Sequence, residues 1–299
     1  MPKNKKSTGL KIALPNGSLE EGTMRLFREA NFEITRNHRQ HDAYIDDLLV
    51  EQVVFIRPQH IPHFVEEGIC DIGICGLDCV VESMANVAVL GELPYGRGNS
   101  LGRTHVALFS SEEADYFSIK DIPMNSRILT EYPNITRYAF KRARIPVKIE
   151  FSYGGTEALI PSLAPFGVCL SDTGKSLRAN GKKLLNYLSA SYTALIANQR
   201  ALGEKSDEVK ALHLHLSGAT WAREKVLLKM NVPAKKKDAV LNILPALKKP
   251  TITALSDGVS FAVESVVPKE DSTTLIVRLA QEGAEGIIEL SINKIVSNW

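Results

Sequence analysis

Short apolar runs alternate with amphipathic stretches along the first two thirds of the chain. Runs of strand length lie at Lys11–Leu14, Tyr44–Ile45, Leu48–Val50, Val53–Ile56, Asp71–Gly76, Val106–Ser110, Arg127–Thr130, Val147–Phe151, Val168–Leu170 and Tyr192–Ala197. Helices are predicted after the turn Pro15–Ser18, at Ile61–Glu67, Ile135–Ala143 and Leu177–Leu188, and briefly from Glu157. Strands that alternate with helices in this way predict an α/β fold with a mainly parallel sheet.

The pattern changes near Ala219. Strands are predicted at Lys225–Val232, Thr251–Leu255, Ser260–Val267 and Gly286–Leu290, and helices at Ala234–Leu247 and Ser272–Glu282. The order β-α-β-β-α-β is that of a ferredoxin-like unit. Such a unit at the end of an enzyme serves as a sensor or as a module for oligomer formation.

The glycine-rich stretch Gly91–Gly102 separates two groups of predicted elements, which indicates two lobes. We place the first lobe at residues 1–104 and 187–218, the second at 105–186, and the ferredoxin-like domain at 219–299. The predicted fold class is therefore α/β, with two lobes like those of periplasmic binding proteins around a cleft. Loops from both lobes can meet a small ligand in such a cleft.

The segment Ser171–Leu177 carries the strongest candidate chemistry. The strand Val168–Leu170 turns through Thr173–Gly174 into a predicted helix, so several backbone N–H groups and the helix dipole point at one place. This arrangement suits a phosphate, and the alternative is an ordinary strand–helix turn with polar caps. It is not a Walker A loop, because the residue five positions before Gly174 is Cys169 instead of glycine.

The composition of the 299 residues, 44% hydrophobic and 23% charged, is typical of globular domains. A net charge of +2 gives no reason to expect a nucleic-acid partner. No apolar run reaches the length of a membrane span, and the first residues lack the apolar core of a secretory signal, so we expect a cytoplasmic protein. The cysteines lack a C-x-x-C pair, which favours reduced, buried thiols over a metal or redox site; they are Cys70, Cys75, Cys79 and Cys169.

Many short motifs follow one another in a consistent order from Lys11 to about Val296. They are Leu14–Pro15–x–Gly17, Arg57–x–x–x–Ile61–Pro62, Val65–Glu66–x–Gly68, Asp71–x–Gly73–Ile74–x–Gly76–x–Asp78, Tyr132–Pro133–Asn134, Gly155–x–Glu157, Thr173–Gly174–x–Ser176–Leu177–Arg178–Ala179–Asn180–Gly181, Leu195–Ile196–Ala197–Asn198, Leu228–Lys229–Met230–Asn231–Val232–Pro233, Pro250–Thr251 and Gly283–Ala284–Glu285–Gly286–Ile287. Together they resemble the long form of ATP phosphoribosyltransferase, the first enzyme of histidine biosynthesis.

The resemblance implies a transfer reaction without a covalent enzyme intermediate. N1 of the ATP adenine attacks C1 of the ribose in phosphoribosyl pyrophosphate (PRPP) and displaces pyrophosphate. Because N1 already carries a lone pair, the task of the protein is to position the substrates and to stabilise the developing charges. The implied cofactor, Mg²⁺, takes most of its ligands from water and phosphate, so its protein ligands stay unknown.

The resemblance also implies site residues. The PRPP-binding residues are Glu157, Asp172, Thr173, Gly174, Lys175 and Ser176; the ATP-binding residues are Gly17, Arg57, Gly76 and Asp78; the catalytic residues are Arg57 and Asp172. Structural alternatives stay open for the charged ones. Arg57 grips phosphate or stacks on adenine, or it forms a surface salt bridge. Asp78 lines the cleft or caps a helix. Asp172 and Glu157 contact ribose hydroxyls or magnesium, or they cap the helices that follow them, since a carboxylate beside phosphate requires a cation between them.

The chain departs from the family pattern in motifs that border the cleft. The family loop P-K-G-R reads Pro15–Asn16–Gly17–Ser18, so both basic residues are missing. Acids of the family patterns R-x-x-D-I-P and A-D-x-I-x-D-L fall on His60, Pro165 and Cys169. An alternative function is therefore a catalytically weakened member that acts as a small-molecule-binding sensor, although Lys175 restores one positive charge near the phosphate.

The resemblance implies that the ferredoxin-like domain at 219–299 is an ACT-like regulatory domain and that histidine inhibits the enzyme through it. Leu247 and Thr251 match the effector-binding segment, and the alternative is that they are packing residues between modules. The usual assembly of the family is a hexamer built from dimers, so the expected partners are ATP, PRPP, histidine and further copies of this chain, as a homo-hexamer or dimer.

Overall fold

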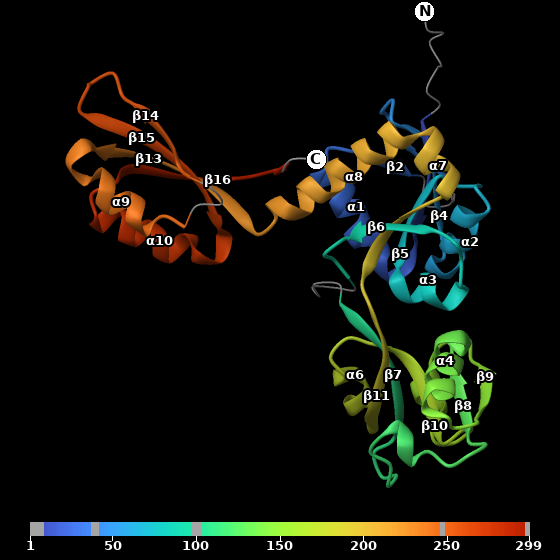
Figure 1. Ribbon diagram of the computed structural model, residues 1–299. Coiled ribbons are helices and arrows are strands. Elements are labelled where there is room, and N and C mark those ends of the chain that lie inside the picture. Colours follow the sequence, from blue (N-terminus) through green and yellow to red (C-terminus); the bar gives the residue numbers. More distant parts are fainter. Residues whose placement is uncertain (1–8, 37–41, 97–102, 246–248, 297–299) are drawn as a thin grey trace, which may run out of the picture. The chain divides into compact units, whose positions relative to one another are not determined.

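The computed structural model describes residues 9–36, 42–96, 103–245 and 249–296 (Figure 1). The chain divides into two compact units. The first contains the residues up to His213 except Glu29–Asn31, and the second contains Glu29–Asn31 and the residues from Leu214 onward. The described residues form two sheets in the first unit and one in the second.

A seven-stranded sheet forms lobe I of the first unit. Its described strands, in spatial order, are β2 (Ile34–Arg36), β3 (Asp42–Ile45), β4 (Val50–Ile56), β1 (Leu10–Pro15), β5 (Ile72–Gly76), β12 (Thr193–Ala197) and β6 (Ala88–Glu92). The central strands β4, β1 and β5 are parallel, whereas β12 runs antiparallel to β5 and β6, and β3 runs antiparallel to β2 and β4. The prediction of a mainly parallel sheet is therefore wrong for lobe I, whose described sheet is mixed. Strands β5 and β12 are almost entirely buried, as expected for strands covered on both faces.

Helices connect the strands of lobe I. They are η1 (Gly17–Leu19), α1 (Glu20–Glu29), η2 (Pro58–His60), α2 (Ile61–Glu66), α3 (Leu77–Ser83) and α7 (Gln199–Glu204), followed in the chain by α8 (Ser206–Ala222). Helix α2 packs on β1, β5 and β12 through Ile61 and Val65. Gly73 of β5 allows this approach, because a Cβ there would collide with the side chain of Ile61.

A five-stranded sheet forms lobe II. Its described strands, in spatial order, are β11 (Lys182–Ser191), β7 (Thr104–Ser111), β10 (Phe166–Ser171), β8 (Arg127–Thr130) and β9 (Lys148–Phe151). The helices are η3 (Ile119–Asp121), α4 (Pro133–Ala143), α5 (Thr156–Leu159) and α6 (Lys175–Ala179). Alternate residues of β7 face two separate apolar cores. Val106 and Leu108 pack with Phe140 of α4, while Ala107 packs with Leu177 of α6.

The helix predicted at Leu177–Leu188 is wrong beyond its first turn. Helix α6 ends at Ala179, and Lys182–Ser191 is strand β11, which pairs with β7 along its whole length. Consecutive residues Leu184 and Leu185 point into the two different cores, which is the alternation of a strand. Because this pairing continues to Ser191, the lobe boundary placed at residue 187 falls inside β11.

Strands β7 and β11 connect the lobes of the first unit, as Figure 1 shows. Thr104, at the start of β7, pairs with Ser191, at the end of β11. Strand β12 follows two residues later and belongs to the sheet of lobe I. A side chain near residues 104 and 191 therefore lies at the junction of the lobes.

The second unit has a four-stranded antiparallel sheet. Its described strands, in spatial order, are β14 (Thr251–Ala254), β15 (Ser260–Pro268), β13 (Lys225–Pro233) and β16 (Glu285–Ser291), joined through η4 (Ala234–Lys236), α9 (Lys237–Ile243) and α10 (Lys269–Gln281). Both α9 and α10 pack on one face, where alternate β13 residues such as Val226 and Leu228 are buried. The predicted ferredoxin-like order is confirmed.

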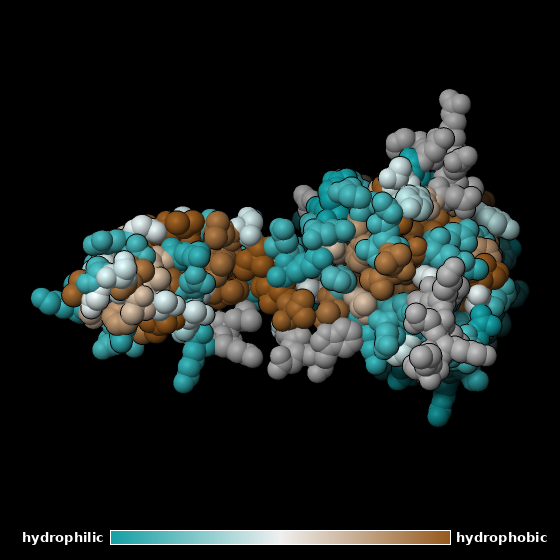
Figure 2. Space-filling view, turned by 90° about the horizontal axis from the view of Figure 1, so that it is seen from above, coloured by the Kyte–Doolittle hydropathy of each residue, from teal (hydrophilic) through white to brown (hydrophobic). Residues whose placement is uncertain are grey.

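In the face that Figure 2 shows, hydrophobic residues gather in places and are elsewhere interspersed with hydrophilic ones. Among the described residues, no helix is both long enough and apolar enough to cross a membrane.

Candidate active site

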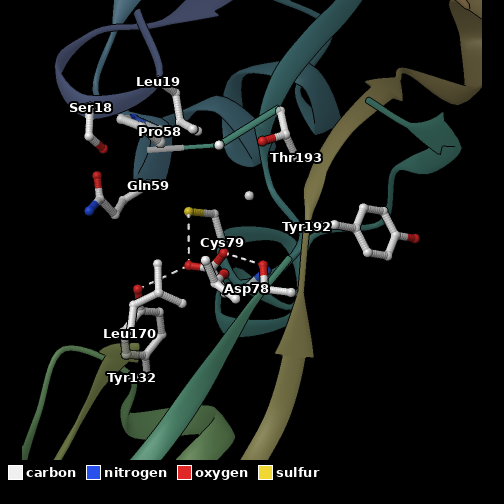
Figure 3. Close-up of a pocket in the computed structure, with 14 residues that line it drawn as sticks. Ser18, Leu19, Pro58, Gln59, Asp78, Cys79, Tyr132, Leu170, Tyr192 and Thr193 are labelled. Atoms are coloured by element: carbon white, nitrogen blue, oxygen red, sulfur yellow. Dashed lines mark hydrogen bonds between the residues drawn. The ribbon is translucent and has the colours of Figure 1, made fainter. Parts of the chain in front are cut away.

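Two neighbouring pockets lie between lobe I and lobe II of the first unit. The smaller has a volume of about 60 Å³ and the larger of about 550 Å³, and they share Gln59, Cys79 and Tyr132. The smaller pocket (Figure 3) is lined by Ser18, Leu19, Pro58, Gln59, Gly76, Asp78, Cys79, Gly96, Thr104, Tyr132, Leu170, Ser191, Tyr192 and Thr193. The larger is lined by Arg57, Gln59, His60, His63, Cys79, Glu82, Ser83, Glu131, Tyr132, Pro133, Asn134, Phe151, Ser152 and Tyr153.

Two turns at the ends of parallel strands deliver lobe I residues to these pockets. Arg57 follows β4 and is the N-cap of η2, where Pro58 takes the first helical position that suits proline. Gly76 ends β5 and is the N-cap of α3. A Cβ on Gly76 would collide with the carboxylate of Asp78, so the glycine allows Asp78 to turn back toward the pocket.

Asp78 is a buried carboxylate held by hydroxyl groups from two other segments (Figure 3). The Ser191 hydroxyl donates to Oδ1 at 2.5 Å, and the Tyr132 hydroxyl donates to Oδ2 at 3.0 Å. The backbone N–H of Asp78 donates to Ser191 Oγ at 3.0 Å. Burial, reinforced by the charge of Asp78, raises the pKa of Tyr132 and keeps its hydroxyl a donor. Asp78 thus lines the smaller pocket and also joins α3, the lobe junction and lobe II.

Glu82 makes a second connection between the lobes. Its carboxylate accepts hydrogen bonds from the backbone N–H groups of Asn134, at 2.8 and 3.1 Å, and of Ile135, at 3.0 Å. These groups open helix α4, so Glu82 of lobe I supplies the negative charge that the N-terminus of a lobe II helix favours. Burial raises the pKa of Glu82, and the two N–H groups oppose that rise.

The larger pocket has walls of different chemistry. Arg57, His60 and His63 come from η2 and α2 and are exposed. Phe151 and Tyr153 come from the end of β9 and the loop that follows it. One wall therefore offers cationic and hydrogen-bonding groups, and another offers aromatic rings.

The predicted phosphate loop lies at the end of β10. Gly174 has φ 70° and precedes α6, and its N–H donates to Ser171 Oγ at 3.2 Å. The exposed residues at this turn are Asp172, Thr173, Lys175 and Ser176. Leu170, shortly before the loop, lines the smaller pocket, while the loop residues themselves line neither pocket. The guanidinium of Arg178 donates to Thr173 O at 3.2 Å, which brings a second cation to the loop.

The other predicted residues lie as follows. Gly17 is exposed with φ 76° in the turn after β1, next to Ser18 of the smaller pocket. Glu157 lies in the first turn of α5, after the loop that carries Tyr153. Thr251 is the exposed first residue of β14, in the second unit. Leu247 lies outside the described residues.

The positions that depart from the family pattern have varied surroundings. Cys169 is 3% exposed and packs in an apolar cluster with Phe109 and Leu177. Pro165 is exposed. Asn16 is the N-cap of η1 without a side-chain cap, and its N–H donates to Ile56 O at 2.9 Å. His60 lines the larger pocket, and Ser18 lines the smaller one.

Several pocket or loop residues were not predicted; they are Glu82, Tyr132, Phe151, Tyr153, Arg178 and Ser191. Arg178 had a usable signal, because it follows Gly174 by about one helical turn. Tyr153 directly precedes two glycines, which indicate a turn, so the sequence could have placed an aromatic side chain on an exposed loop. Tyr132 and Ser191 had no local signal, since they meet Asp78 from far along the chain.

The prediction of reduced, buried cysteines is confirmed: all four are buried and none forms a disulfide. Burial raises the pKa of Cys70 to about 11 and that of Cys79 well above its usual range. Within the described part of the chain, no group of three or more His, Cys, Asp or Glu side chains is placed to hold a metal ion.

Comparison with known proteins covers both units. The family model of ATP phosphoribosyltransferase matches residues 57–218, and that of the HisG C-terminal domain matches residues 222–294. An ATP phosphoribosyltransferase of Desulforudis audaxviator is 36% identical over 96% of this chain and 99% of its own length. One of Nitratidesulfovibrio vulgaris is 38% identical over 96% and 98%. In the solved ATP phosphoribosyl transferase (HisG:HisZ) complex from Thermotoga maritima, a chain shares the fold with a TM-score of 0.60 at 22% identity, over 70% of this chain and 96% of that one.

Proposed function

The chain belongs to the ATP phosphoribosyltransferase family, and on that premise we propose that it transfers the phosphoribosyl group of PRPP to N1 of ATP. The products are N1-(5-phosphoribosyl)-ATP and pyrophosphate, at the entry to histidine biosynthesis. The observation that carries the proposal is the identity of 36% and 38% with two relatives of that name over 96% of the chain. The pockets between the lobes offer a place for the reaction.

Each substrate has a matching surface. The 5′-phosphate of PRPP binds at the turn before α6, where Thr173 and Ser176 offer hydroxyl groups and Lys175 and Arg178 offer positive charge. ATP enters the larger pocket, whose volume of about 550 Å³ is in the range of nucleotide-sized ligands. Arg57, at its wall, forms hydrogen bonds with the triphosphate. Glu157 and Asp172 contact the ribose hydroxyls of PRPP.

The chemistry requires positioning more than proton transfer. The lone pair of adenine N1 forms the new bond to C1 of the ribose, while the bond from C1 to the pyrophosphate oxygen breaks and its electron pair leaves with pyrophosphate. Positive charge develops on the ribose ring and negative charge on the leaving group. Positive charge at the cleft stabilises the leaving group, and carboxylates such as Asp172 stabilise the ribose.

The residues at the cleft fit Mg²⁺ as a cofactor carried by the substrates. Oxygen donors are what this cation prefers, and Glu157 and Asp172 supply carboxylates on lobe II. When bound, Mg²⁺ neutralises the pyrophosphate. Asp172 and Glu157 would hold the cation through water molecules or bind ribose hydroxyls, and its positive charge would relieve their repulsion from phosphate.

We further propose that histidine inhibits the enzyme through the ferredoxin-like unit. Thr251 starts an exposed edge strand, β14, where a ligand or another subunit can add hydrogen bonds. The proposed assembly is a homo-hexamer or dimer, which light scattering with and without histidine tests.

The deciding experiment measures pyrophosphate release by the purified full chain with ATP, PRPP and Mg²⁺, with either substrate omitted as control. Release that needs both substrates supports the transfer reaction, and suppression by histidine supports feedback inhibition. Binding of ATP and PRPP without release supports the sensor instead. The observation in favour of that second function is Cys169, a thiol within an apolar cluster where the family pattern has an acid.

A further inference from the structure

Two aromatic side chains are exposed at the wall of the larger pocket. Phe151 is 54% exposed and Tyr153 is 98% exposed, although aromatic rings are usually covered in folded proteins. Their ring centroids are 4.8 Å apart and their planes are inclined by 81°. The two rings thus form a corner of two aromatic faces that lies open to a cavity of about 550 Å³.

The backbone that carries these rings is fixed on both sides. Phe151 is paired with Thr130 in the parallel ladder of β8 and β9, and the N–H of Ser152 donates to Thr130 O at 2.9 Å. The hydroxyl groups of Ser152 and Thr156 are hydrogen-bonded at 2.7 Å, and both residues are buried. The loop therefore presents the rings from a defined position, which reduces the ordering cost of binding a flat ligand.

The surroundings of the rings select a kind of flat ligand. Arg57, His60 and His63 line the same pocket and suit the phosphates of a nucleotide. Glu131 also lines it, and its Oε1 lies 4.0 Å from where a Cβ of Gly154 would be, next to Tyr153. A carboxylate accepts a hydrogen bond from an exocyclic amino group and repels a carbonyl oxygen. The corner therefore suits a 6-aminopurine better than a 6-oxopurine.

We propose that Phe151 and Tyr153 form the binding platform for the adenine of ATP, with Glu131 as acceptor for its amino group. The inference rests on the proposed function, for which it names the residues that select the base. Stacking on either ring leaves the edge of the adenine, with N1, free to face PRPP. The loop that carries Tyr153 leads directly into α5 with Glu157, so base and ribose are positioned by one segment.

The test compares ligands that contain the base with one that lacks it. Dissociation constants of ATP, ITP and inorganic triphosphate are measured by calorimetry for the full chain and for Phe151→Ala, Tyr153→Ala and Tyr153→Phe. Loss of one stacking partner should weaken ATP binding about 10- to 100-fold, while triphosphate binding stays unchanged. Tyr153→Phe should bind ATP as the parent does, because it keeps the ring. Phe117→Ala is the matched control, since Phe117 is 69% exposed and lines neither pocket.

Glu131→Gln tests the selection of the base. The preference for ATP over ITP should fall in this variant, because an amide also donates to a 6-oxo group. Unchanged ATP binding in the Phe151→Ala/Tyr153→Ala double variant overturns the proposal, as does an equal loss for ATP and triphosphate. Both results are independent of turnover. Absence of pyrophosphate release in the parent protein would count against the proposed reaction alone.

Discussion

The hydrogen bond between Tyr132 and Asp78 allows a sharp test of how the two lobes are held together. In Tyr132→Phe the ring stays and only the hydroxyl is lost. Asp78 is 4% exposed, and among the described residues its Oδ2 then keeps just the hydrogen bond from the Cys79 thiol, at 3.7 Å. A hydrogen bond to a charged group contributes about 1.5–3 kcal/mol, so the variant should lose that amount of unfolding free energy. For a unit of this size the loss corresponds to a decrease in Tm of about 3–12 °C.

Scanning calorimetry measures this change, with Tyr138→Phe as the control. Tyr138 is 64% exposed on helix α4, and removal of its hydroxyl should cost less than about 0.5 kcal/mol. Both tryptophans, Trp221 and Trp299, follow residue 213, so tryptophan fluorescence reports the second unit separately. A double-mutant cycle with Asp78→Asn isolates the pair. A Tm within 1 °C of the parent, or a coupling energy near zero, would refute the reasoning.

Three further substitutions have effects that the structure predicts. Burial raises the pKa of Glu82 above its usual 4.5, so the unfolding free energy of the parent falls as pH rises from 4.5 through the raised value. Glu82→Gln does not titrate, so the stability advantage of the parent over this variant, measured by urea unfolding, should decrease across that pH range. An advantage that grows with pH would contradict the sign. Cys169→Asp, which restores a family acid, should lower the unfolding free energy in the same assay by about 3 kcal/mol or more, because the carboxylate enters an apolar cluster. Stability equal to that of the parent would mean that water reaches the site. Gly174→Ala should lower the unfolding free energy by about 1–2 kcal/mol and weaken PRPP binding, because φ at this position is 70° and the new Cβ would lie 3.3 Å from the Arg178 guanidinium. Unchanged PRPP affinity in calorimetry would place the 5′-phosphate elsewhere.

The sequence by itself determined most of the elements with a clear periodicity. In β13 the alternation of Val226, Leu228, Met230 and Val232 predicts one buried face, and the structure has it. The ferredoxin-like order and the α/β class follow from the sequence of such elements. The turn at Gly174 was also predictable, because glycine adopts a positive φ without steric cost.

Prediction from the local pattern failed where pairing with another strand determines the secondary structure. Leu184, Leu185 and Leu188 suit a helix as well as a strand, and pairing with β7 makes the segment β11. Helix α8 was missed because Leu212, Leu214 and Leu216 alternate with His213 and His215, which suits a strand. In the helix Leu212, Leu216 and Ala219 form one buried face, and Leu214 lies outside it.

Only the tertiary structure decided how the cleft is held and lined. Tyr132 and Ser191 are 54 and 113 residues from Asp78, and no periodicity links them. The same applies to Glu82, which caps a helix of the other lobe. Sequence pattern records which side chains are buried or turn the chain, because these depend on neighbours within a few positions. The partners of a buried charge depend on which distant segments the fold brings together.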